Sequence, residues 1–173
     1  TLFSCSLNEY NPKEITEDEK LQTFDGFYGL SNYCYQPICG QLFTASYYFS
    51  TTEAGTDLCI TANNNNNTQQ LFYYESLDPT TNATNKLWLQ AYSSIALCNK
   101  VINRAPNVKD GVAGDIQILT AEAHCLRAFY YSILVEQYGG VTLTLNENTE
   151  GVDFAPKRAT VEEIYKQMVK DLK

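Results

Sequence analysis

Few side chains of this sequence are placed to do chemistry together. Glu53 and Asp57 are two carboxylates four residues apart, and a pair of carboxylates is what a glycoside hydrolase requires. Gly55 lies between them, so a polar loop edge is the simpler interpretation. The single histidine, His124, precedes Cys125, but neighbouring positions of a helix point about 100° apart, which disfavours a Cys–His nucleophile pair. We therefore predict that the chain is not an enzyme.

Metal and cofactor chemistry is not indicated either. The six cysteines contain no C-x-x-C pair, and the chain has a single histidine to offer as a further ligand. We predict no metal and no cofactor. Cys98 and Cys125 each fall inside a helical apolar pattern, which predicts small buried hydrophobic side chains. An even number of cysteines would allow disulfides in a secreted domain, and the sequence leaves open whether Cys34, Cys39 and Cys59 are bridged.

Binding is better supported, because tyrosine is abundant. The chain has 13 Tyr, 8 Phe and 1 Trp, and a tyrosine ring can stack on a ligand while its hydroxyl reaches water. Two aromatic clusters, residues 47–49 and 72–74, flank an asparagine run at 63–67, which brings together the aromatic faces and amide groups that recognise sugars. Tyr48, Tyr73 and Tyr74 are the candidate ligand-binding residues. Core packing is the alternative for each cluster, in which at least one ring has to point inward.

Length and composition exclude several classes of protein. A chain of 173 residues with 44% hydrophobic and 18% charged residues is typical of one soluble globular domain. Its apolar runs fall short of the ~20 residues that a membrane-spanning helix requires. Twelve Lys and Arg against twenty Asp and Glu give a net charge of −8, which repels phosphate backbones, so nucleic acid is not expected as a partner.

The first residues resemble an export signal. A short apolar stretch ends in a small residue, Ser4, directly before Cys5. This pattern resembles the end of a bacterial lipoprotein signal peptide, in which the cysteine becomes the acylated first residue. On this interpretation residues 1–14 are a signal remnant and tether, residues 15–173 form the domain, and a lipid on Cys5 is the only membrane contact. The alternative is a frayed N-terminus with an incidental cysteine.

The elements that must position the candidate residues are predicted to be helices. Thr16 and Glu19 match a capping box, and the apolar spacing that follows predicts one helix running through Tyr28 with a stripe toward the core. Pro37 indicates a break, and a second helical piece is expected from about Gln41.

The second half of the chain has clearer periodicity. Helices are predicted over residues 87–104 and 115–138, and a capped helix is predicted from Thr160 to the end of the chain. Residues 50–86 are rich in Asn and Thr and are expected to be mostly irregular. The short connection 105–114 makes the two longer helices antiparallel neighbours. The predicted fold is all-α, with helical hairpins of tetratricopeptide-like type and long irregular loops.

This half also resembles a known family. Residues 122–141 read EAHCLRAFYYSILVEQYGGV and resemble the EA..LRA..Y..LV..YGGVP motif of the SusD/RagB family of outer-membrane nutrient-binding lipoproteins. Residues 88–99 resemble the family's W-x3-Y-x2-I-x3-N helix, residues 158–172 resemble its R.T.eEIY..iv.DL helix, and Cys5 resembles its lipidation site. The motif positions taken from the resemblance are Trp88, Tyr92, Asn99, Glu122, Arg127, Tyr131, Gly139 and Gly140.

The resemblance implies a SusD-like N-terminal helical domain and a function. The implied protein is a cell-surface lipoprotein in the outer membrane of a Gram-negative bacterium. It captures oligosaccharides or polysaccharides and hands them to a TonB-dependent, SusC-like transporter. The alternative is a helical-repeat adaptor that contacts the transporter, or a peptide binder, without glycan affinity of its own. Family members are longer, so the chain is expected to be the N-terminal part alone.

Two details of the motif carry structural expectations. Glu122 and Arg127 are five residues apart on one helix, so each is expected to reach a neighbouring helix or a backbone carbonyl rather than the other. Thr142 stands where the family usually has proline, so the turn after Gly140 is expected to be less rigid here.

Overall fold

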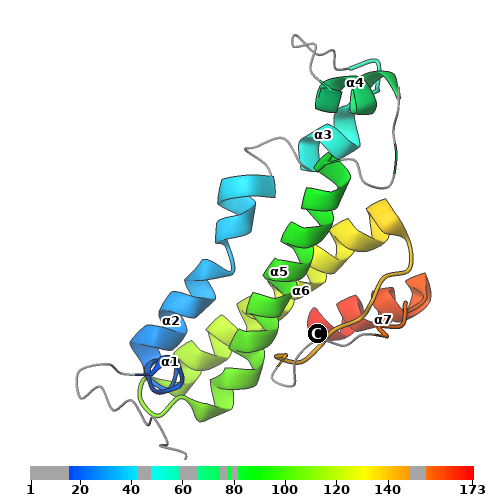
Figure 1. The fold of residues 1–173 in the computed structure, drawn as a ribbon. Coiled ribbons are helices and arrows are strands. Elements are labelled where there is room, and N and C mark those ends of the chain that lie inside the picture. The colour runs from blue at the N-terminus through cyan, green and yellow to red at the C-terminus, as the bar shows by residue number, and fades with distance from the viewer. Residues whose placement is uncertain (1–15, 43–47, 59–65, 75–77, 79–81, 149–154) are drawn as a thin grey trace, which may run out of the picture.

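The fold is all-α, as predicted, in a computed structural model that describes residues 16–42, 48–58, 66–74, 78, 82–148 and 155–173 (Figure 1). Cys5, Tyr47 and Cys59, which the sequence analysis singled out, lie outside the described residues. The helical elements are α1 (Glu17–Leu21), α2 (Phe24–Tyr33), a π-helical turn η1 (Ile38–Leu42), α3 (Tyr48–Glu53), α4 (Asn66–Tyr73), α5 (Asn82–Arg104), a 3-10 turn η2 (Ala105–Asn107), α6 (Ala113–Tyr138) and α7 (Val161–Asp171).

The centre of the fold is the antiparallel pair α5 and α6, which confirms the predicted hairpin (Figure 1). Pro106 lies in η2, where its ring ends α5, and a short loop returns the chain into α6. Gly139 ends α6 with φ +71°, a conformation that glycine adopts without the steric cost of a side chain. Helix α2 packs against both members of the pair, and α7 packs against α6.

The N-terminal helix is divided, which corrects the prediction of one continuous element. The Thr16 capping box forms as predicted, with the Glu19 amide donating to Oγ1 of Thr16 and the Glu19 carboxylate accepting from the Thr16 amide. Helix α1 then ends at Leu21, because Thr23 is extended and its hydroxyl accepts from the Gly26 amide as the cap of α2.

Two further boundaries differ from the sequence prediction. The second helical piece begins before Gln41, since helical turns run from Gln36 through η1. The stretch 50–86 is more helical than expected: it holds the end of α3, all of α4 and the first turn of α5. Asparagine and threonine favour loops, but they also occur at helix N-termini, where their side chains accept hydrogen bonds from the free backbone amides.

One hydrophobic core joins the helices. Most of its buried side chains come from α2, α5 and α6, and Leu42 of η1, Val141 after α6 and Ile164 of α7 complete it. Cys98 is buried, as predicted, but Cys125 is exposed, which corrects the prediction for that residue. Tyr28, predicted on the inward stripe, is instead 50% exposed.

Candidate functional site

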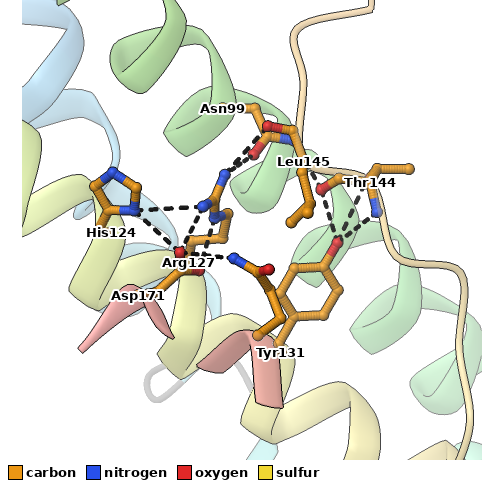
Figure 2. Close-up of polar contacts among 8 residues, drawn as sticks. Asn99, His124, Arg127, Tyr131, Thr144, Leu145 and Asp171 are labelled. Atoms are coloured by element: carbon orange, nitrogen blue, oxygen red, sulfur yellow. Dashed lines mark hydrogen bonds and ion pairs between the residues drawn. The ribbon is translucent and has the colours of Figure 1, made fainter. Parts of the chain in front are cut away.

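An extended segment, residues 141–148, is held by many side-chain hydrogen bonds, and we call it the strap. It leaves α6 after Gly140 and runs back along α5 and α6 (Figure 2). A Cβ added to Gly140 would lie 2.5 Å from the Ala159 carbonyl oxygen, so only glycine allows this approach. The Ala159 amide donates to the Val141 carbonyl at 2.9 Å, and Thr142 forms a single antiparallel bridge with Arg158.

Side chains of α5 and α6 hold the strap by its main-chain oxygens (Figure 2). The donors are the tyrosine hydroxyls, one amide and one guanidinium of the family motif. The bonds run from Tyr92 to the Thr142 carbonyl (2.8 Å), from Asn99 to those of Thr144 (3.0 Å) and Asn146 (3.4 Å), from Tyr131 to that of Thr144 (2.8 Å), and from Arg127 to that of Leu145 (3.2 Å). The strap therefore keeps its path without a neighbouring strand.

Arg127 is the centre of this arrangement and is 3% exposed. Its Nε donates to Asp171 Oδ2 at 2.8 Å and its Nη2 to Asp171 Oδ1 at 2.6 Å, a two-point contact between α6 and α7. Its Nη1 donates to the Asn99 side-chain oxygen at 2.8 Å as well as to the strap. One buried cation thus connects α5, α6, α7 and the strap, and Arg127 reaches a neighbouring helix as expected.

Asp171 completes the charge balance. His124 Nδ1 lies 3.0 Å from its Oδ1, and Gln167 Nε2 donates to the same oxygen at 2.9 Å. Burial acts to raise the pKa of Asp171, but the hydrogen bonds from Arg127 and His124 outweigh it and hold that pKa below its ordinary value. Asp171 is therefore charged over the physiological pH range.

The remaining motif residues support the ends of the strap. Trp88 packs against Tyr92 (ring centroids 4.9 Å apart) and edge-on against Tyr138 (5.0 Å), beside the point where the strap leaves α6. Burial raises the pKa of Tyr92 to about 12, so its hydroxyl stays a donor. Glu122 lies beside the hydroxyl of Tyr35 instead. Partial burial raises the pKa of Tyr35, and the negative charge and hydrogen bond of Glu122 raise it further.

Arg104 fixes the far end of the strap. Its Nε and Nη2 donate to the two carboxylate oxygens of Glu147 at 2.7 and 3.0 Å, and its Nη1 donates to Asp18 at 2.7 Å. These ion pairs raise the pKa of Arg104 further above its usual value. The neighbouring Lys100 pairs with Glu17 of α1. Both ends of the strap are thus tied to α5.

This cluster is built to hold a backbone path rather than to react. Its histidine, carboxylate and guanidinium are hydrogen-bonded to one another, and it contains no hydroxyl or thiol next to a base that could serve as a nucleophile. In the described part of the chain, no three His, Cys, Asp or Glu side chains are grouped so as to hold a metal ion. Cys34 and Cys39 are free thiols.

The aromatic candidates lie apart from the strap, near the start of α5 at the α3–α4 end of the molecule, which we call the tip (Figure 1). Tyr73 is 58% exposed at the end of α4, and Tyr74 follows it, 63% exposed, with φ +56°. The Tyr74 ring lies over Gly55, where an added Cβ would meet its hydroxyl at 2.5 Å. Tyr48 is half-buried in α3, and burial raises its pKa. The structure therefore presents two of the three tyrosines to solvent.

Sequence reasoning missed some members of the strap cluster. Asp171 entered the sequence prediction only as part of a motif. It lies one turn beyond the partly buried Met168 and two turns beyond the buried Ile164, and a carboxylate at that spacing is a signal for a buried partner. The strap carbonyls had no signal, because every residue has a main-chain oxygen. Glu147 lies 43 residues from its partner Arg104, beyond the reach of any local pattern.

Comparison with known proteins identifies the family. The SusD-like family, described as starch-binding and associating with outer membrane, matches residues 30–173, and the chain belongs to this family. No curated protein sequence matches the chain. Across the described residues, no helix has the length and apolar character needed to cross a membrane.

Three solved structures share the fold at 20% sequence identity each. Surface glycan-binding protein A from Bacteroides fluxus gives a TM-score of 0.67 over 86% of this chain and 32% of its own length. A SusD superfamily protein from Parabacteroides distasonis gives 0.69 over 91% and 33%. A SusD-like protein from Bacteroides fragilis gives 0.69 over 94% and 31%. The chain therefore spans about a third of the length of these proteins.

Proposed function

We propose that this chain is part of a glycan-binding protein of the bacterial cell surface, not an enzyme, which captures oligosaccharides or polysaccharides and passes them to a TonB-dependent, SusC-like transporter. Membership of the SusD-like family supports binding of starch-like glycans at the outer membrane. The observation that carries the proposal within this chain is the exposed tyrosine pair at the tip.

The tip has the chemistry that sugars require. The faces of a pyranose ring carry C–H groups that stack on an aromatic ring, while the hydroxyls at its edge need donors and acceptors. Tyr73 and Tyr74 offer two exposed rings with their own hydroxyls, and Gly55 lets the second ring lie close to the backbone, which limits its freedom before a ligand arrives. Tyr48 is the third proposed ligand-binding residue.

Attachment and delivery form the second half of the proposal. A lipid on Cys5 would hold the domain at the outer membrane surface, with residues 1–14 as signal remnant and tether before the domain at 15–173. The partner would be the transporter, since a soluble binding domain cannot itself move a sugar across the membrane. An adaptor without glycan affinity is the competing function.

The test is a binding screen of the chain against neutral oligosaccharides, with starch fragments first, by isothermal titration calorimetry. We expect Tyr73→Ala/Tyr74→Ala to weaken binding by roughly tenfold or more, because loss of a stacked ring costs about 1 kcal/mol or more per contact. Tyr28→Ala is the control, since Tyr28 is a half-exposed tyrosine on α2, away from the tip. Co-purification with a transporter but no response to any glycan would support the adaptor instead.

A further inference from the structure

A hollow lies beside the strap, along α7 and the residues that precede it. It is a groove of about 630 Å³ between the strap and α7, which we call the basic groove. Its lining residues are Leu143, Lys157, Arg158, Ala159, Glu163, Lys166, Gln167 and Lys170. Four of these eight side chains are cations and one is a carboxylate, in a chain whose net charge is −8.

The cations on α7 share one face of the helix. Glu163, Lys166, Gln167 and Lys170 follow the spacing of three and four residues that places side chains one above another. Ile164 is buried against α6 and lies on a different face. The groove face of α7 is therefore separate from the face that carries Ile164.

In the part of the chain that the structure describes, the two carboxylates of the first turn of α7 are already engaged. Glu163 accepts from the amide and the hydroxyl of Thr160 in the α7 capping box, which also closes the helix N-terminus. Glu162 pairs with Lys166 at 2.7 Å. Among the described residues, Lys157, Arg158 and Lys170 have no carboxylate within ion-pair distance, whereas Arg104 and Arg127 are fully paired.

Helix stability does not explain this placement. A cation is favourable near the C-terminus of a helix, as Lys170 is, but Lys157 and Arg158 precede the N-terminus of α7, where the helix dipole is positive and a cation is unfavourable. Lys157, Arg158 and Lys170 line one groove, and like charges close together repel one another as well. Both effects oppose the arrangement and both are relieved by a bound anion.

The walls of the groove are also fixed in advance. Leu143 stands between Thr142 and Thr144, whose carbonyls are held by Tyr92, Asn99 and Tyr131, and the Ala159 amide bonds the start of the strap. A preformed groove loses less entropy when it binds. The Arg158 guanidinium can make a two-point contact with a carboxylate or a sulfate.

We propose that the basic groove binds the carboxylate or sulfate groups of an acidic glycan. This inference rests on the proposed function, since it names the class of glycan that this part of the chain recognises. The groove would be a second contact with the glycan: the tip stacks on sugar rings, and the groove binds carboxylate or sulfate groups.

The test compares ligands that differ only in charge. Oligogalacturonate is set against its methyl ester, and dextran sulfate against dextran, by isothermal titration calorimetry with the chain. We expect each charged ligand to bind at least roughly tenfold tighter than its neutral counterpart, with affinity falling as salt is raised, because surface ion pairs are screened. Lys157→Gln/Lys170→Gln should remove most of this preference.

The control is Lys20→Gln/Lys109→Gln, which removes the same charge from exposed positions outside the groove and should leave the preference unchanged. If neither charged ligand is preferred, or if both double variants lose the same affinity, the proposal is wrong.

Vesicles of phosphatidylglycerol and phosphatidylcholine form a further arm. Groove-dependent binding to them, without any preference among the glycans, would overturn the proposal in favour of a lipid-facing surface. Loss of neutral-glycan binding in the Tyr73→Ala/Tyr74→Ala variant remains the separate test of the proposed function.

Discussion

The pair formed by Arg127 and Asp171 allows a quantitative prediction. Arg127→Met removes two bonds to Asp171 and leaves that buried carboxylate with only His124 and Gln167 as donors. An uncompensated buried charge costs about 3–5 kcal/mol in the free energy of unfolding. Asp171→Leu leaves the Arg127 cation with neutral acceptors alone, and we expect a loss of similar size.

The double variant Arg127→Met/Asp171→Leu should lose much less than the sum of the two. It leaves no buried charge, and the remaining cost is that of two acceptors without their donor, the Asn99 side-chain oxygen and the Leu145 carbonyl, at about 1–3 kcal/mol each. Arg127→Met leaves the same two acceptors without their donor, so their cost cancels when the double variant is compared with the single variants. What remains is the cost of the uncompensated charges, and we therefore expect a coupling energy of at least about 3 kcal/mol between the two positions.

The assay is urea unfolding, followed by circular dichroism for the helices and by the fluorescence of Trp88, the single tryptophan, for the α5 environment. Agreement of the two probes establishes that one transition is measured. Additive losses, with the double variant near the sum of the singles, would refute the reasoning, because the two charges would then not be compensating each other.

Three further predictions follow from the strap and its surroundings. Gly140→Ala should destabilise the chain by about 1–3 kcal/mol, because the new Cβ meets the Ala159 carbonyl. Gly29 in α2 has open space around it, so Gly29→Ala should stabilise the chain by about 0.5–1 kcal/mol. Thermal unfolding of the two variants measures both effects. Tyr92→Phe should lower the free energy of unfolding by about 1 kcal/mol at neutral pH, because it removes the hydrogen bond to the Thr142 carbonyl. The pKa of Tyr92 is raised to about 12, so in the wild type this stabilisation is complete below about pH 10 and is lost as the pH rises through 12. The pKa of Asp171 is lowered, so its contribution is present above about pH 4 and is lost as the pH falls further; Asp171→Asn should flatten the acid limb of a stability–pH curve.

Much of the fold could be predicted because its strongest signals are local. The capping boxes at Thr16 and Thr160 form as the sequence indicates, and the apolar repeats of α5 and α6 mark their extent to within a few residues. The break at Thr23 could not be predicted as easily, since threonine also occurs inside helices and only the local backbone conformation turns it into a cap.

The strap cluster was predictable only in part. Arg127 and Asn99 were named by their motif, and a structural ion pair was expected for the arginine. Its partner Asp171 lies 44 residues away in the sequence, and the acceptors at Thr144 and Leu145 are main-chain atoms. Such a pair forms only because α7 packs against α6, and no local pattern in the sequence predicts that packing.

Because α5 and α6 hold the strap by its carbonyl oxygens, the fold places few demands on several of its side chains. At Thr142, Leu145 and Asn146 the atom that is held is present in every amino acid, proline included. Substitutions there can alter the chemistry of the adjoining surface while the path of the chain is preserved. The Thr142 of this chain, in place of the usual proline, is one such change. The strap is thus a stretch of the chain whose side chains can change while its main-chain path is kept.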